Sequence, residues 1–245
     1  MKAYVNAIIK DKILNIGLER NHKKNALTEK MYLELANLIT KASENNDINV
    51  ILISGGDDFT AGNDLNDFIK NPPSGKNSPV FQFMSALTNC PLPVVAAVEG
   101  VAVGIGTTML LHCDIVYASR NSVFMMPFIN LGLVPEFGSS QLLQKRTGYL
   151  KAAEMLMLGE KFNAETALEY RLINQICDGE ELLKVAQNSA KKLAMKPRDS
   201  LIMTKSLMRR EFEPVKDRIE FEAQHFMDFL KKESTKEIIN KINKK

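Results

Sequence analysis

Glu136 is an acidic residue in a stretch, residues 131–140, whose other side chains are mostly apolar or small. A carboxylate beside Val134, Pro135 and Phe137 would lose part of its hydration, which raises its pKa toward neutrality. Such a group suits general acid–base catalysis, because its pKa lies near the working pH. The alternative is an ordinary acid in the first turn of a helix, where the helix dipole favours a negative charge.

Two glycine-containing turns follow two short apolar segments that read as buried strands. Residues 59–65 follow the segment 50–53, and residues 99–106 follow the segment 94–98. In an open parallel sheet, ligands bind beyond the carboxyl ends of the strands, and glycine lets backbone N–H groups point at them. The second turn also opens a predicted helix, whose N-terminus attracts negative charge. Two converging N–H groups would form an oxyanion hole, and ordinary structural turns are the alternative.

Other arrangements of reactive residues fit the sequence poorly. Met109 stands where a dinucleotide-binding fingerprint needs its third glycine, and Asp114 comes too soon to be its acidic residue. No lysine of a phosphate-binding loop follows either turn, and no GxSxG motif of a serine hydrolase is present. His112 falls on a predicted buried helix and is expected to be a packed side chain. The remaining histidines are expected at the surface: His22 and His225.

Charge and composition narrow the class of partner. The 245 residues are 45% hydrophobic and 25% charged, which is typical of a globular protein with a sizeable core. The formal net charge of +3 is too small to indicate nucleic acid as the main partner. It still allows a local basic patch for a phosphorylated ligand.

The cysteines and the apolar runs favour a cytoplasmic protein without a membrane span. Three widely spaced cysteines predict neither a disulfide framework nor a zinc site, so no metal is expected and a reducing cytoplasm fits best. The first residues lack the apolar run of a signal peptide. The longest apolar stretch, residues 93–103, is interrupted by Glu99 and Gly100, so we expect no membrane span. The final residues, 243–245, do not form a peroxisomal address.

Strand and helix patterns alternate along the first two thirds of the chain. This alternation predicts an α/β fold with right-handed crossovers and a largely parallel sheet, followed by a mostly helical last third. Residues 71–79 are rich in Pro, Ser, Gly and Asn and are expected to form a mobile loop that could cover a substrate. The expected strands are 4–10, 13–18, 50–53, 94–98, 115–118 and 172–177. The expected helices are 28–43, 104–112, 139–147, 151–158, 164–170, 180–195, 198–209 and 214–231.

Taken together, these segments resemble the enoyl-CoA hydratase/isomerase, or crotonase, family over essentially the whole chain. The segments that carry the resemblance are 19–27, 59–65, 93–106 with Cys113 and Asp114, and 131–140. The resemblance implies a spiral core of ββα units in residues 1–190, which holds the CoA and acyl site. It implies a helical trimerisation region in residues 191–245, and hence a homotrimer or a dimer of trimers. The implied ligand is an acyl-CoA thioester, with CoA as part of the substrate and no separate cofactor.

The resemblance also assigns roles by position. The backbone N–H groups of Asn63 and Ile105 correspond to the two oxyanion donors, and Glu136 corresponds to the single base of Δ3,Δ2-enoyl-CoA isomerases. Hydratases of the family carry two glutamates, whose positions are taken here by Thr108 and Phe128. The resemblance therefore favours isomerisation, with hydration as the alternative. The residues expected to bind substrate are Lys24, Ala61, Gly62, Asp64, Leu65, Gly104 and Phe128.

Two other classes of protein require features that this sequence lacks or would leave without a role. A peptidase of the related Clp-type fold would need a serine nucleophile near a histidine, and His112 is the one plausible partner. A CoA-binding or RNA-binding protein without activity would not need Glu136 or the two turns. Both classes therefore explain the sequence less well than an acyl-CoA enzyme does.

Overall fold

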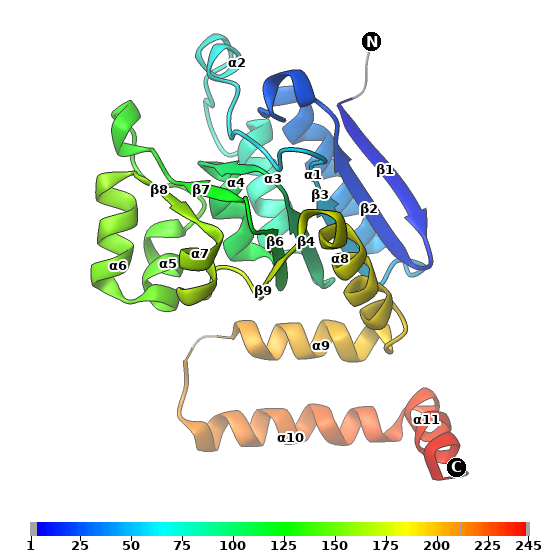
Figure 1. The fold of residues 1–245 in the computed structure, drawn as a ribbon. Helices are drawn as coiled ribbons and strands as arrows, with labels where there is room; N and C mark the ends of the chain where they lie inside the picture. The colour runs from blue at the N-terminus through cyan, green and yellow to red at the C-terminus, as the bar shows by residue number, and fades with distance from the viewer. Residues whose placement is uncertain (1–3, 211, 244–245) are drawn as a thin grey trace. The chain divides into compact units, whose positions relative to one another are not determined.

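The computed structural model describes residues 4–210 and 212–243, with side chains described as far as residue 239 (Figure 1). Its first compact unit extends to Lys196, and a second begins at Pro197. The predicted boundary after residue 190 falls within the last helix of the first unit, Gly179–Ala194. No helix in the described ranges is both long and apolar enough to cross a membrane.

A six-stranded sheet in the order β1-β2-β3-β4-β6-β9 forms the centre of the first unit. The hairpin β1–β2 is antiparallel, and all the other pairs are parallel. Asp11 and Lys12 both adopt positive φ, as the tight hairpin turn requires. The predicted largely parallel sheet is thus confirmed. Its strands are β1 Val5–Lys10, β2 Ile13–Leu18, β3 Val50–Ser54, β4 Val94–Val98, β6 Ile115–Ser119 and β9 Gln175–Cys177.

A second sheet of three short strands was not foreseen as a sheet. It has the order β5-β7-β8, with β5 Val101–Val103, β7 Val123–Met125 and β8 Lys161–Asn163. Three residues are too few to show the alternation by which a strand is recognised, so β5 and β8 could not be predicted as strands. A bridge between Thr60 and Ala102 links this sheet to the first glycine turn.

Helices cover both faces of the six-stranded sheet. Helix α8, Gly179–Ala194, packs on one face through Leu182, Ala186 and Ala190, against side chains such as Val95. Helices α1, Glu29–Glu44, and α3, Pro79–Thr88, pack against each other away from α8 (Figure 1). The remaining helices of this unit are η1 Asn21–Lys23, α2 Leu65–Lys70, α4 Ile105–Thr108, η2 Met109–His112, η3 Ile129–Leu131, α5 Ser139–Thr147, α6 Tyr149–Ala153, η4 Glu154–Leu158 and α7 Ala164–Glu169.

Several predicted boundaries need correction. The helix expected over 104–112 is α4 followed by a 3-10 turn, and the one expected over 151–158 is α6 followed by a π turn. The expected loop ends at Ser78, because Pro79 is the first residue of α3, where its fixed φ is favourable. The strand expected over 172–177 is confined to β9.

The second unit is helical, as predicted. It contains α9 Arg198–Arg209, α10 Val215–Lys231 and α11 Glu233–Asn243, of which α11 was not anticipated. Phe226 on α10 is 67% exposed, and Met227 and Leu230 are also exposed. A helix with this many exposed apolar side chains presents a surface suited to a partner.

Candidate active site

The two glycine turns lie against each other. Phe59 N–H donates to Glu99 O at 2.7 Å, and Thr60 both donates to Val101 O at 2.9 Å and accepts from Val103 N–H at 3.0 Å. Residues 59–65 and 99–106 are therefore in direct contact. This contact needs glycine in particular, because a Cβ at Gly62 would lie 2.6 Å from Val103 O and one at Gly106 would lie 2.9 Å from Thr60 O.

Within the first turn, the backbone N–H groups on either side of Asn63 are occupied. Gly62 N–H donates to Thr60 Oγ1 at 3.1 Å, and Asp64 N–H donates to Leu27 O at 2.9 Å. The N–H of Asn63 itself donates to no acceptor within the described residues. It is therefore free to bind a ligand oxygen.

The second turn follows the same pattern. Gly104 adopts a φ of +56° and a ψ of −119°, and its N–H donates to Met125 O at 2.8 Å. The N–H groups of Thr107 and Thr108 both donate to Gly104 O. In the described part of the chain, Ile105 N–H has no acceptor, so it is a second open donor beside the first.

Glu136 is held on a strained turn before α5. The next two residues, Phe137 and Gly138, both have positive φ, which an aromatic residue rarely adopts. His112 supports this conformation: its ring stacks on Phe137 at a centroid distance of 4.0 Å, and its Nε2 lies 2.8 Å from Phe137 O. His112 is therefore a packed side chain, as predicted. Ser139 completes the turn, because its N–H and its Oγ both donate to Glu136 O.

The carboxylate of Glu136 faces α4. Its Oε1 accepts a short hydrogen bond from Thr108 Oγ1, while its Oε2 is buried without a partner among the described residues. Burial raises the pKa of Glu136 to about 7, and the bond from Thr108 opposes that rise. The predicted rise is confirmed, and it leaves the carboxyl poised to take up and release a proton near neutral pH. Thr108 is the last residue of the helix that Ile105 begins, so one short helix carries both the open N–H and the contact to Glu136.

Two of the predicted substrate-binding residues are engaged in ion pairs. Arg20 Nη2 lies 2.7 Å from Asp64 Oδ2, and Asp64 also caps α2. Partial burial acts to raise the pKa of Asp64, but hydrogen bonds from the Asp67 N–H and from Arg20 lower it overall. Lys24 Nζ lies 3.7 Å from Asp58 Oδ2, with the Lys24 side chain 62% exposed.

The other predicted residues lie on or beside the two turns. Ala61 N–H donates to Lys24 O at 2.8 Å, and Leu65 is an exposed first residue of α2. Phe128 is buried, and its ring lies 4.0 Å from where a Cβ of Gly104 would stand. Within the described residues, no group of histidine, cysteine and carboxylate side chains is arranged to hold a metal ion.

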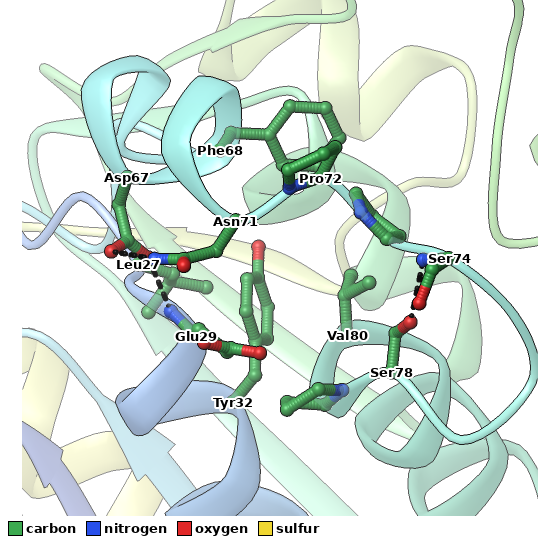
Figure 2. Close-up of a pocket in the computed structure, with 12 residues that line it drawn as sticks. Leu27, Glu29, Tyr32, Asp67, Phe68, Asn71, Pro72, Ser74, Ser78 and Val80 are labelled. Atoms are coloured by element: carbon green, nitrogen blue, oxygen red, sulfur yellow. Dashed lines mark hydrogen bonds between the residues drawn. The ribbon is translucent and has the colours of Figure 1, made fainter.

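Tyr32 is a site residue that the sequence did not single out. It is 3% exposed, and its hydroxyl donates to Asn63 Oδ1 at 2.5 Å. It also lines a cavity of about 240 Å³ between α1, α2 and the start of α3 (Figure 2). The spacing of apolar residues could have placed Tyr32 on the buried face of α1, next to Met31. No local sequence pattern could have predicted its hydrogen bond to Asn63, which lies 31 positions away.

Comparisons with known proteins agree with this arrangement. The family described as enoyl-CoA hydratase/isomerase matches residues 9–244. The chain belongs to this family. Human enoyl-CoA delta isomerase 2 is 32% identical over 244 residues, which cover 96% of this chain and 62% of the human protein. The 1,2-epoxyphenylacetyl-CoA isomerase of Escherichia coli K12 is 33% identical, over 80% of this chain and 78% of that protein.

Solved structures of similar proteins identify the fold of this family member. A candidate enoyl-CoA hydratase/carnithine racemase from Magnetospirillum magneticum AMB-1 superposes with a TM-score of 0.96 and 44% identity, covering 100% of this chain and 97% of the other. An enoyl-CoA hydratase/isomerase from Pseudoalteromonas atlantica T6c superposes with a TM-score of 0.81 and 33% identity, covering 99% of this chain and 97% of the other. The fold is therefore the α/β crotonase fold with a C-terminal helical region, as predicted, and it also contains the second sheet that was not foreseen. The relatives include isomerases and hydratases, so identity alone leaves the reaction open.

Proposed function

We propose that this family member is an enoyl-CoA delta isomerase, which moves the double bond of a 3-enoyl-CoA to the 2-position. The observation that carries the proposal is the pairing of Glu136 with Thr108. A hydratase of the family would carry its two glutamates at the positions of Thr108 and Phe128. With neither acid present, Glu136 is the carboxylate left to act, which suits a proton shuttle better than the activation of water.

The reaction needs two proton transfers, and the substrate gains and loses no protons overall. Glu136, as the carboxylate, removes a proton from Cα of the acyl group, and the electron pair delocalises into the thioester as a dienolate. The resulting carboxylic acid returns the proton to Cγ, and the double bond forms between Cα and Cβ. A pKa of about 7 lets one group serve in both directions, because neither its acid nor its base form is strongly disfavoured at neutral pH.

The thioester oxygen carries negative charge between the two transfers. In the proposal, the open N–H groups of Asn63 and Ile105 bind that oxygen. Fixed donors of this kind are each worth about 3–4 kcal/mol of transition-state stabilisation, because they need no reorganisation during the reaction. Ala61, Gly62 and Gly104 shape the backbone around the thioester, and the exposed Lys24 is proposed to contact the CoA phosphates.

The proposal is tested by following two substrates in a spectrophotometer. With trans-3-hexenoyl-CoA, we expect absorbance to rise as the conjugated thioester forms. With crotonyl-CoA, we expect no loss of absorbance, since hydration would remove the conjugation. The matched control is Glu136→Gln, which keeps the shape and should lower kcat about a hundredfold or more with little change in KM. Hydration of crotonyl-CoA without isomerisation would replace this proposal by the hydratase alternative.

We further propose a homotrimer or dimer of trimers in the cytoplasm, acting in fatty acid metabolism. The exposed apolar side chains of α10, among them Phe226, Met227 and Leu230, support association of this kind. Light scattering at micromolar concentration should give the mass of three or six chains. A stable monomer would refute the proposed assembly.

A further inference from the structure

Tyr32 lies outside both glycine turns but contacts the first of them through Asn63. It lies in the first turns of α1, and its ring packs against Phe83 at a centroid distance of 5.7 Å. Phe83 in turn packs edge-on against Phe137, the residue after Glu136, at 6.0 Å. The rings of Tyr32, Phe83 and Phe137 therefore form one aromatic cluster, which connects the residue that contacts the first glycine turn with the turn that carries Glu136.

Leu27, just before α1, holds the backbone on both sides of Asn63, and its O accepts from Asp64 N–H at 2.9 Å. Leu27 N–H donates to Gly62 O at 2.7 Å, which fixes the carbonyl end of the peptide group between Gly62 and Asn63. The nitrogen end of the same peptide group is the open N–H of Asn63. Tyr32 holds that end indirectly, by donating its hydroxyl to Asn63 Oδ1.

An attachment at Asn63 itself matters because Gly62 has little intrinsic stiffness. Its φ is +86°, a conformation that glycine adopts freely and can also leave freely. The backbone bonds to Leu27 fix the Gly62 carbonyl and the Asp64 N–H, but they leave the Asn63 N–H itself unbonded, so they do not by themselves set its direction toward a ligand oxygen. Across the described residues, the Asn63 side chain has no other hydrogen-bond partner, so Tyr32 is what restrains it.

Tyr32 is suited to this task because it stays protonated. Burial, and then the negative charges of Glu136 and Asp67, raise the pKa of Tyr32 well above its usual value. Its hydroxyl therefore remains a donor throughout the pH range of the reaction. Figure 2 shows the ring of Tyr32 among the residues that line the cavity, with its hydroxyl toward the side formed by α2.

We propose that Tyr32 is a positioning residue: its hydroxyl holds Asn63 so that the backbone N–H of Asn63 points at the thioester oxygen. The inference rests on the oxyanion role proposed above for Asn63. It adds that the rate depends on a side chain outside both glycine turns, at the start of a helix. It also predicts that Tyr32 affects turnover more than it affects binding.

The variants Tyr32→Phe and Asn63→Ala test the two ends of this contact. Tyr32→Phe should lower kcat for trans-3-hexenoyl-CoA about tenfold and change KM less than about twofold, since a single neutral hydrogen bond is lost. Asn63→Ala keeps the backbone N–H and should lower kcat by a similar factor. The double variant should be no slower than the worse single variant, because both remove one interaction.

A spectroscopic measurement separates positioning from folding. Bound 2,4-hexadienoyl-CoA should absorb at longer wavelength than the free thioester, because donors on its carbonyl oxygen polarise the conjugated system. Tyr32→Phe and Asn63→Ala should both reduce this red shift. The matched control is Tyr117→Phe, which removes a buried hydroxyl that lies 2.7 Å from Ser189 Oγ on the α8 face of the sheet. It should lower Tm and leave kcat and the red shift unchanged.

The outcomes distinguish this inference from the proposed function. If wild-type protein shifts the dienoyl-CoA spectrum but does not isomerise 3-hexenoyl-CoA, the isomerase proposal fails and the role of Tyr32 is still tested by the red shift. If Tyr32→Phe retains both the wild-type kcat and the wild-type red shift, the positioning role is refuted. Losses that multiply in the double variant would also refute it. Should Tyr32→Phe not fold, Asn63→Ala with an unchanged red shift would overturn the inference by itself.

Discussion

Replacing Thr108 by valine removes the hydroxyl that donates to Glu136 Oε1 and leaves the volume of the buried side chain almost unchanged. In the folded protein this hydrogen bond lowers the pKa of Glu136 against the effect of burial, and the balance lies at about 7. Without the bond, burial acts alone. The carboxylate is then harder to form, so the pKa of Glu136 must rise further.

The size of the rise follows from the strength of the bond. A hydrogen bond to a charged group contributes about 1.5–3 kcal/mol, and each pKa unit corresponds to about 1.4 kcal/mol, so the pKa should rise by about 1–2 units. Wild-type Glu136 is about half ionised at pH 7, whereas the variant would be about 1–10% ionised. The rate at pH 7 should therefore fall about 5- to 50-fold, and most of it should return by about pH 9.5.

The assay is the pH dependence of kcat/KM for trans-3-hexenoyl-CoA, which reports the ionisation of the free enzyme. The rising limb should have its midpoint near pH 7 for the wild type and should move to higher pH in Thr108→Val. Thr108→Ser is the matched control, because it keeps the donor and should keep the midpoint. A folded Thr108→Val protein with the wild-type midpoint would refute the assignment of Glu136 as the base that Thr108 tunes.

Three further predictions concern stability and the open N–H groups. Because the folded-state pKa of Glu136 lies above its usual 4.5, its ionisation destabilises the fold as pH rises from about 4.5 to 7. At pH 8, Glu136→Gln should therefore have a higher Tm than wild type and a free energy of unfolding larger by up to about 3 kcal/mol. At pH 4 the two proteins should not differ in this way. Ile105→Pro removes an open N–H and should cost about 3–4 kcal/mol in transition-state stabilisation. Ile105→Ala keeps the donor, so it should lower the stability of the fold more than it lowers kcat. With circular dichroism as the folding control, an equal kcat per folded site for Ile105→Pro and wild type would contradict the oxyanion assignment. Gly62→Ala should lower Tm markedly, since its Cβ would meet Val103 O at 2.6 Å, and an unchanged Tm would show that the two turns do not need this close approach.

The sequence by itself determined the elements whose signal is local. The run of apolar residues in β4 is fully buried. The spacing of Met31, Leu35, Leu38 and Ile39 predicted the buried face of α1, at whose edge Leu38 is half-buried. The start of α1 at Thr28 also followed from sequence, because an N-cap acts within one turn: Thr28 accepts from Met31 N–H. The glycines of both turns and Glu136 could be found for the same reason, since each is unusual in its immediate neighbourhood.

Tertiary structure decided everything that depends on residues far apart in the chain. The high pKa of Glu136 was predicted from its apolar neighbours, but one of these, Val134, is 78% exposed and cannot shield it. The carboxylate is buried because the strained turn at Phe137 folds it against Thr108, 28 positions earlier in the chain. Likewise, Asn63 finds Tyr32 31 positions away. Local sequence patterns carry no record of such pairs, because the pairs exist only once the sheets have brought the turns and α1 together.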